Sequence, residues 1–153
     1  MRSRAAAGFT LIELLVVLAI IAIAVATVSL AIRDPSETRL EQEGARLAAL
    51  LEAARAEARA SGLAVRWVPN GADAPRPGFR FVGLPASSEL PAQWLDENVV
   101  AQVDGAGAVT LGPEPLIGAQ RVVLRLGEKS LVLATDGLGP FAVADASSPP
   151  APR

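Results

Sequence analysis

The stretch Arg4–Val25, RAAAGFTLIELLVVLAIIAIAV, joins a long apolar run to a single carboxylate, Glu13. Glu13 is the only charged residue between Phe9 and Ile32, and a helix of that length spans the hydrocarbon core of a bilayer, which is about 30 Å thick. A carboxylate at the bilayer centre costs about 3 kcal/mol, and such groups are functional where they occur. The sequence therefore predicts a membrane-spanning helix in which Glu13 has a specific task.

Basic residues precede this apolar run and none lies within it. Arg2 and Arg4 stand before the apolar residues, and the positive-inside tendency keeps such arginines in the cytoplasm. The part of the chain after Ile32 is then expected on the other side of the membrane. The chain has no cysteine, so disulfide usage gives no independent indication of the compartment.

Three interpretations of this segment stay open from its composition alone. A cleaved secretory signal would use a site such as Ala24-Val25-Ala26, but the apolar residues continue through Ile32. A plain signal anchor explains the length and the orientation and leaves Glu13 unexplained. Alternatively, Glu13 lies close enough to the helix end for its carboxylate to reach the interface at little cost.

The six residues Gly8–Glu13, GFTLIE, follow a short basic leader and begin the apolar run. This arrangement closely resembles the class III signal of type IV pilins and type II secretion pseudopilins. The resemblance implies cleavage after Gly8 by a membrane prepilin peptidase, N-methylation of the new terminus at Phe9, and an assembly role for Glu13. In that family the glutamate is thought to pair with the N-terminal amine of a neighbouring subunit. Such a pair would remove two uncompensated charges from the membrane at once.

A second helix is predicted directly after the apolar one. Asp34-Pro35 interrupts the helical pattern and Ser36 is a suitable N-cap, so the chain either kinks or restarts there. Apolar and small residues then recur at spacings of three and four up to Gly62. This pattern predicts an amphipathic helix that packs on a sheet rather than in a coiled coil. The expected buried positions are Leu40, Gly44, Leu47, Leu51, Ala54 and Ala58. The positions expected to point elsewhere are Glu41, Glu43, Arg46, Glu52, Arg55, Glu57 and Arg59.

After Gly62 the apolar residues alternate instead, which predicts antiparallel strands in one sheet. Leu63, Val65 and Trp67 are expected on one buried face. Turn-like links at 127–129 and 136–140 connect the last three strands into a meander. The expected strands are 63–68, 79–82, 99–103, 109–111, 122–126, 131–135 and 141–143.

Catalytic chemistry has few candidate residues in this chain. It has no His, Cys or Tyr and one Lys, so Ser-His-Asp, Cys-His and zinc-ligand sets are absent as usually built. Asp96 and Glu97 are adjacent acids on a predicted loop, a pattern typical of a solvated edge rather than of a general acid–base pair. We expect no enzyme, no catalytic residue and no cofactor. A bitopic membrane enzyme that uses Asp96 or Glu97 is the formal alternative.

The C-terminal part contains three features that bear on metal, nucleic-acid and partner binding. The segment 136–139, DGLG, lacks the oxygen ligands at alternate positions that an EF-hand-like calcium loop needs, so a hairpin turn and no metal are expected. The net charge of −2, without a basic patch in this part, disfavours nucleic acid. Trp67 is expected in the core. Trp94, on a loop-borne turn between Pro91 and Asp96, is the better candidate for a partner contact.

The head resembles the GspH/FimT family of minor pilin-like subunits through PAQWLDENV at 91–99 and LVLATDGLGPFAV at 131–143. The expected fold class is therefore α+β and pilin-like. A long N-terminal α-helix, half membrane-spanning and half amphipathic, packs on an antiparallel β-sheet head. The expected organisation is a prepilin leader peptide at 1–8, a transmembrane and assembly helix at 9–33, an amphipathic spine helix at 34–62, a periplasmic β-rich head at 63–146 and a disordered tail at 147–153.

This resemblance implies a minor pseudopilin of type II secretion, a structural subunit at the tip of the periplasmic pseudopilus involved in protein export across the outer membrane. Its partners would be the other minor pseudopilins, the major pseudopilin and the prepilin peptidase. It would sit in the inner membrane as a single-pass protein with its head in the periplasm. The alternative is a FimT-like minor type IV pilin involved in pilus assembly or DNA uptake. A DNA-binding pilin would show a basic C-terminal surface, which this sequence lacks.

Overall fold

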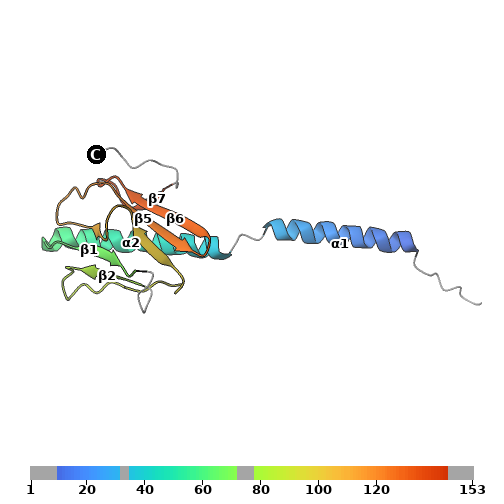
Figure 1. Cartoon of the computed structure of the whole chain (residues 1–153), viewed down its shortest axis with the longest axis horizontal. Helices are drawn as coiled ribbons and strands as arrows, with labels where there is room; N and C mark the ends of the chain where they lie inside the picture. The colour runs from blue at the N-terminus through green and yellow to red at the C-terminus, as the bar shows by residue number, and fades with distance from the viewer. Residues whose placement is uncertain (1–9, 32–34, 72–77, 145–153) are drawn as a thin grey trace, which may run out of the picture. The chain divides into compact units, whose positions relative to one another are not determined.

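The computed structural model describes residues 10–31, 35–71 and 78–144, with the side chains of 25–31 outside the description. The chain divides into two compact units, Met1–Asp34 and Pro35–Arg153, and each is described by itself. The elements are α1 (Leu11–Ala31), α2 (Pro35–Ser61), β1 (Arg66–Pro69), β2 (Phe79–Val82), β3 (Val100–Val103), β4 (Val109–Thr110), β5 (Gln120–Leu126), β6 (Lys129–Thr135) and β7 (Ala142–Ala144), as Figure 1 shows. The expected α+β class with antiparallel sheets is confirmed.

The first unit contains α1, and Thr10 caps its start. The backbone N–H of Glu13 donates to Thr10 Oγ1 at 3.3 Å, and the N–H of Leu14 donates to the Thr10 carbonyl at 3.2 Å. Thr10 is thus the N-cap residue of α1, and Glu13 occupies position N3. Every side chain from Leu11 to Ala24 is exposed. Among the described residues, no helix combines the length and the apolar character needed to cross a membrane.

The second unit begins with α2, whose first residue is Pro35. Proline suits the first helical position because its φ is preset and its missing N–H is not needed there. Ser36 therefore lies inside the first turn, and its prediction as the N-cap is wrong. The helix ends before Gly62, whose φ of 67° lies in the left-handed region that a C-terminal glycine adopts readily.

The predicted apolar face of α2 is confirmed by burial. The six positions with helical spacing are all buried: Leu40, Gly44, Leu47, Leu51, Ala54 and Ala58. A Cβ atom on Gly44 would lie 2.7 Å from Leu131 Cδ2, so the glycine lets α2 approach β6 closely. Two charged residues that were expected to point elsewhere, Glu43 and Arg55, are also buried on this helix, and that expectation is wrong for both.

The strands form two antiparallel sheets rather than the single sheet expected. The strand orders are β2-β1-β4 and β3-β5-β6-β7. The predicted meander of the last three strands is confirmed, with Leu126 opposite Lys129 and Leu133 opposite Val143. Gly127, with a φ of 59°, takes the first position of the two-residue turn between β5 and β6. The short strand β4 instead pairs with β1, where Val109 lies opposite Trp67.

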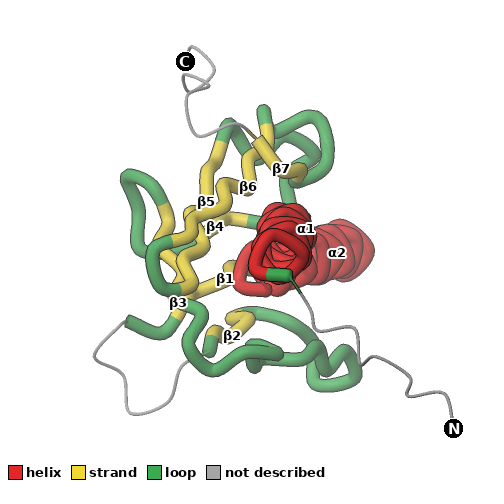
Figure 2. The backbone as a smooth tube through the Cα atoms, turned by 90° about the vertical axis from the view of Figure 1, so that its right-hand side faces the viewer, coloured by secondary structure: helices red, strands yellow, loops and turns green. Residues whose placement is uncertain are grey.

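The core lies between α2 and the sheets. The helix packs on β5, β6 and β7, and Figure 2 shows the strands gathered to one side of it. Val65 and Trp67 are fully buried, as expected, but Leu63, which lies at the start of the predicted strand, is 45% exposed. An aromatic cluster fills one end of the core: the ring centroids of Phe79 and Trp94 lie 4.6 Å apart, and Trp67 lies 5.6 Å from Phe79.

Candidate functional site

The N-terminal segment carries the residues that the sequence assigned to processing and assembly. Gly8 and Phe9 lie outside the described residues. Glu13 lies exposed in the first turn of α1, among exposed apolar neighbours such as Leu14. Within the described part of the chain, its carboxylate has no ion-pair partner.

In the second unit, the buried carboxylate of Glu43 binds backbone N–H groups of the loop that contains Leu95 and Asp96. One carboxylate oxygen, Oε1, accepts the backbone N–H groups of Leu95 and of Asp96, the latter at 3.1 Å. The other oxygen, Oε2, lies 3.6 Å from Arg46 Nη1 and has no hydrogen-bond donor. The Glu43 side chain is 2% exposed, so water contributes little to its stabilisation. The two backbone N–H groups and the Arg46 guanidinium compensate its charge instead.

Two arginines of α2, Arg39 and Arg46, bind the same loop as Glu43. Arg46 Nη1 donates to the Gln93 carbonyl at 2.9 Å, and Arg39 Nη1 donates to Asp96 Oδ2 at 3.3 Å. Arg39, Glu43 and Arg46 follow one another at spacings of four and three, so they share one side of the helix. Hydrogen bonds from the Asn98 backbone and side chain, and then the Arg39 cation, lower the pKa of Asp96 below its ordinary value of 3.8. Asp96 is therefore a charged anchor of the loop at neutral pH.

Near the other end of α2, Arg55 holds two loops. Its Nη1 donates to the Gly139 carbonyl at 2.9 Å. Its Nη2 donates to the Gly137 carbonyl at 2.8 Å and to the Pro115 carbonyl at 3.4 Å. Glu52 Oε1 lies 3.8 Å from Nη1 and accepts the backbone N–H of Phe141 at 3.2 Å. The α2 helix thus fixes the end of the β6–β7 connection and the loop before β5.

The predicted turn at 136–139 is held by its own side chains as well. Asp136 Oδ1 accepts the N–H groups of Leu138 at 2.9 Å and Gly139 at 2.7 Å, and these bonds lower the pKa of the Asp136 carboxyl below 3.8. Thr135 Oγ1 accepts the Gly137 N–H at 2.9 Å and donates to the Gly139 carbonyl at 2.8 Å. Within the described residues, no three His, Cys, Asp or Glu side chains come together as metal ligands.

Trp94 is buried, which corrects its selection as an exposed partner contact. Its side chain is 8% exposed and packs edge-on against Phe79 and Trp67. The loop points the indole inward because Glu43 holds the next two backbone N–H groups from the helix side. Leu95, which follows it, is 67% exposed and is the large apolar side chain that this loop presents to solvent.

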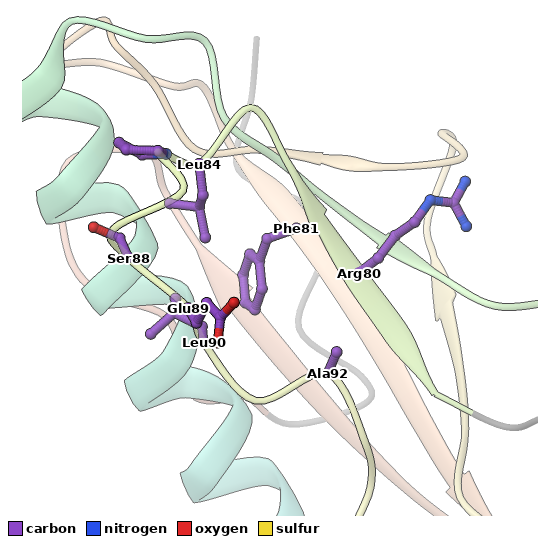
Figure 3. A pocket seen from close by; sticks show the side chains of 8 residues that line it. Arg80, Phe81, Leu84, Ser88, Glu89, Leu90 and Ala92 are labelled. Carbon is purple, nitrogen blue, oxygen red and sulfur yellow. The ribbon is translucent and has the colours of Figure 1, made fainter.

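A groove of about 320 Å³ lies beside β2, the end strand of the three-stranded sheet. Figure 3 shows Phe81 reaching into it from the strand, facing Leu84 and Leu90 of the following loop, while Arg80 extends away. Glu89 adds one carboxylate to the lining. The groove offers apolar contact and no cluster of reactive groups.

The burial of Glu43 and Arg55 was missed, although the spacing held a signal for both. Glu43 lies three residues after Leu40 and four before Leu47, and the latter two are buried. Arg55 likewise lies between two buried residues at helical spacing, four residues after Leu51 and three before Ala58. Charged residues within an apolar spacing are candidates for buried, paired groups.

Comparison with known proteins supports the N-terminal and the head observations separately. Residues 3–29 match the family described as the prokaryotic N-terminal methylation motif. The fold is similar to the crystal structure of the type IV minor pilin FimU of Pseudomonas aeruginosa, strain PAO1. The TM-score is 0.54 at 15% sequence identity, over 73% of this chain and 92% of that chain. No curated protein matches the sequence.

These findings define the class of protein. The chain carries a prepilin-type N-terminal methylation motif and has a type IV pilin-like fold. The motif covers the residues GFTLIE on which the sequence interpretation rested.

Proposed function

We propose that this chain is a minor pseudopilin of a type II secretion system. It is cut after Gly8 and methylated at Phe9, it is held in the inner membrane by the apolar helix, and its head lies in the periplasm. There it joins other minor pseudopilins and the major pseudopilin near the tip of the pseudopilus. It is a structural subunit without catalytic activity, and it helps to move folded proteins toward the outer membrane.

The observation that carries the pilin-like part of the proposal is the position of Glu13, whereas the assignment to type II secretion rests on the resemblance of the head segments 91–99 and 131–143. Glu13 is an exposed carboxylate in the first turn of an apolar helix, inside the methylation motif, without an ion-pair partner in the described part of the chain. Cleavage after Gly8 would leave a positive amine at Phe9. Pairing of Glu13 with such an amine on a neighbouring subunit neutralises both charges in the low-dielectric membrane. Because this pairing leaves no uncompensated charge in the membrane, it favours assembly of the two subunits.

A minor type IV pilin with a role in pilus assembly is the second candidate, and the likeness to the minor pilin FimU favours it. DNA uptake is disfavoured for either role. The net charge is −2, and a DNA-binding head needs a basic surface to displace counterions from phosphates.

Complementation of a strain that lacks the chain separates these roles. The wild-type chain is expected to restore secretion of folded exoproteins, whereas a Glu13→Ala chain is expected to be processed normally and to fail. Secreted enzyme activity, surface pili and the mass of the processed chain are measured together. Restoration of pili without any effect on secretion would support the minor pilin role instead. Full secretion with Glu13→Ala would contradict the assembly role of Glu13.

A further inference from the structure

The proposed function makes no use of Arg55, although its guanidinium is among the most enclosed charges in the described part of the head. The residue is 2% exposed, and its Nε has no hydrogen-bond partner. Burial of an arginine with an unsatisfied nitrogen costs desolvation free energy, and apolar residues of similar volume pack a core position equally well or better. The contacts of its other two nitrogens must therefore account for its presence.

Those contacts join two loops that are distant in sequence from each other and from α2. The guanidinium binds the carbonyls of Gly137 and Gly139 in one loop and the carbonyl of Pro115 in the other. The two loops also touch directly: a Cβ on Gly137 would lie 2.6 Å from the Gly118 carbonyl carbon and oxygen. Gly137 has a φ of 91°, so neither the space nor the backbone there suits another residue.

The polar backbone groups of the loop around 137–139 bind two charged side chains. Its carbonyl oxygens at Gly137 and Gly139 accept from Arg55, while the N–H groups of Leu138 and Gly139 donate to Asp136. The cation thus binds acceptors of the loop and the anion binds donors. The neighbouring Glu52 carboxylate, 3.8 Å from the guanidinium, holds the next N–H, that of Phe141.

We propose that Arg55 is a loop-positioning residue whose guanidinium acts as a fixed internal cation and latches loops 115–118 and 136–141 into one rigid surface. The latch sets the position of two solvent-facing leucines, one in each loop. Leu116 is 63% exposed and Leu138 is 72% exposed. This role goes beyond the proposed function, because it concerns the head alone and holds whichever filament the chain joins.

Hydrogen exchange of the full chain in detergent micelles, read by mass spectrometry, tests the latch. In Arg55→Gln, the amides of 116–118, 137–139 and 141 are expected to exchange roughly tenfold faster or more, since their local opening is no longer opposed by the guanidinium. Exchange in the β5–β6 hairpin is expected to stay as in the wild type. Arg59→Gln is the control, because Arg59 lies on the same helix and is exposed.

Wild-type exchange in both loops of a folded Arg55→Gln chain would overturn the proposal. So would an equal acceleration throughout the head, because Arg55 would then contribute to general stability only. If Arg55→Gln does not fold, Arg55→Lys decides, since it keeps the charge and loses the fork of donors. Faster exchange in both loops of that variant supports the latch, and wild-type rates overturn it. Cleavage after Gly8 is independent of all these outcomes.

Discussion

Glu43 and Arg55 are the two charged residues in the described part of the chain that are almost wholly buried, at 1% and 2% exposure. Each binds backbone groups of a loop far along the chain, 52 residues away for Leu95 and 82 for Gly137. The spacing of apolar residues along the helix predicts that such charges face solvent, because it contains no information about binding partners so far away in the sequence. The three- and four-residue spacings from buried neighbours are the only local signal.

Removal of the Glu43 carboxylate should destabilise the head strongly. In Glu43→Ala the N–H groups of Leu95 and Asp96 lose their acceptor and Arg46 loses a partner, which predicts a loss of about 3–5 kcal/mol in the free energy of unfolding. Tryptophan emission during denaturation measures this loss of unfolding free energy, because both tryptophans of the chain lie in the head core.

Glu41→Ala is the matched control for this measurement. Glu41 lies on the exposed side of the same helix, so its replacement should change the unfolding free energy by no more than about 0.5 kcal/mol. A Glu43→Ala chain as stable as Glu41→Ala would show that the buried carboxylate does not hold the loop.

Among the elements, α2 was the most predictable, because its spacing follows one period over the whole helix and its six apolar positions are buried. The strands from β5 to β7 were predictable for a similar reason: short turns connect them and fix their neighbours. The division into two sheets was not. It depends on the pairing of β4 with β1 through Val109 and Trp67, which are separated in the sequence by β2 and β3.

One glycine between elements sets how closely two segments approach. Gly83, directly after β2, has a φ of 95°, and a Cβ there would lie 2.1 Å from the Ala64 carbonyl oxygen. Gly83→Ala is therefore expected to lower the free energy of unfolding by at least about 2 kcal/mol, from backbone strain and from displacement of the segment before β1.

Gly107→Ala is the comparison, because nothing lies within 4 Å of the position a Cβ would take there. It should leave the tryptophan-detected unfolding midpoint almost unchanged. Equal midpoints for Gly83→Ala and Gly107→Ala would refute the close approach at Gly83.

For the whole molecule, the sequence predicted the fold class and the N-terminal motif, and both are confirmed. Neither Trp94 nor Leu63 occupies the environment expected for it: Trp94 is buried on a loop held by Glu43, and Leu63 is exposed in the segment before β1. The assignment to type II secretion rests on the resemblance of the segments 91–99 and 131–143 and is a proposal.

We propose that the chain is processed and assembled as a pilin-class subunit through Gly8, Phe9 and Glu13. The intact mass and N-terminal sequence of the chain, recovered from membranes of cells that contain a prepilin peptidase, test this processing. We expect a chain that begins at methylated Phe9. A chain that still begins at Met1, or that is cut near Ala26, would contradict this proposal and would leave Glu13 without an assembly role.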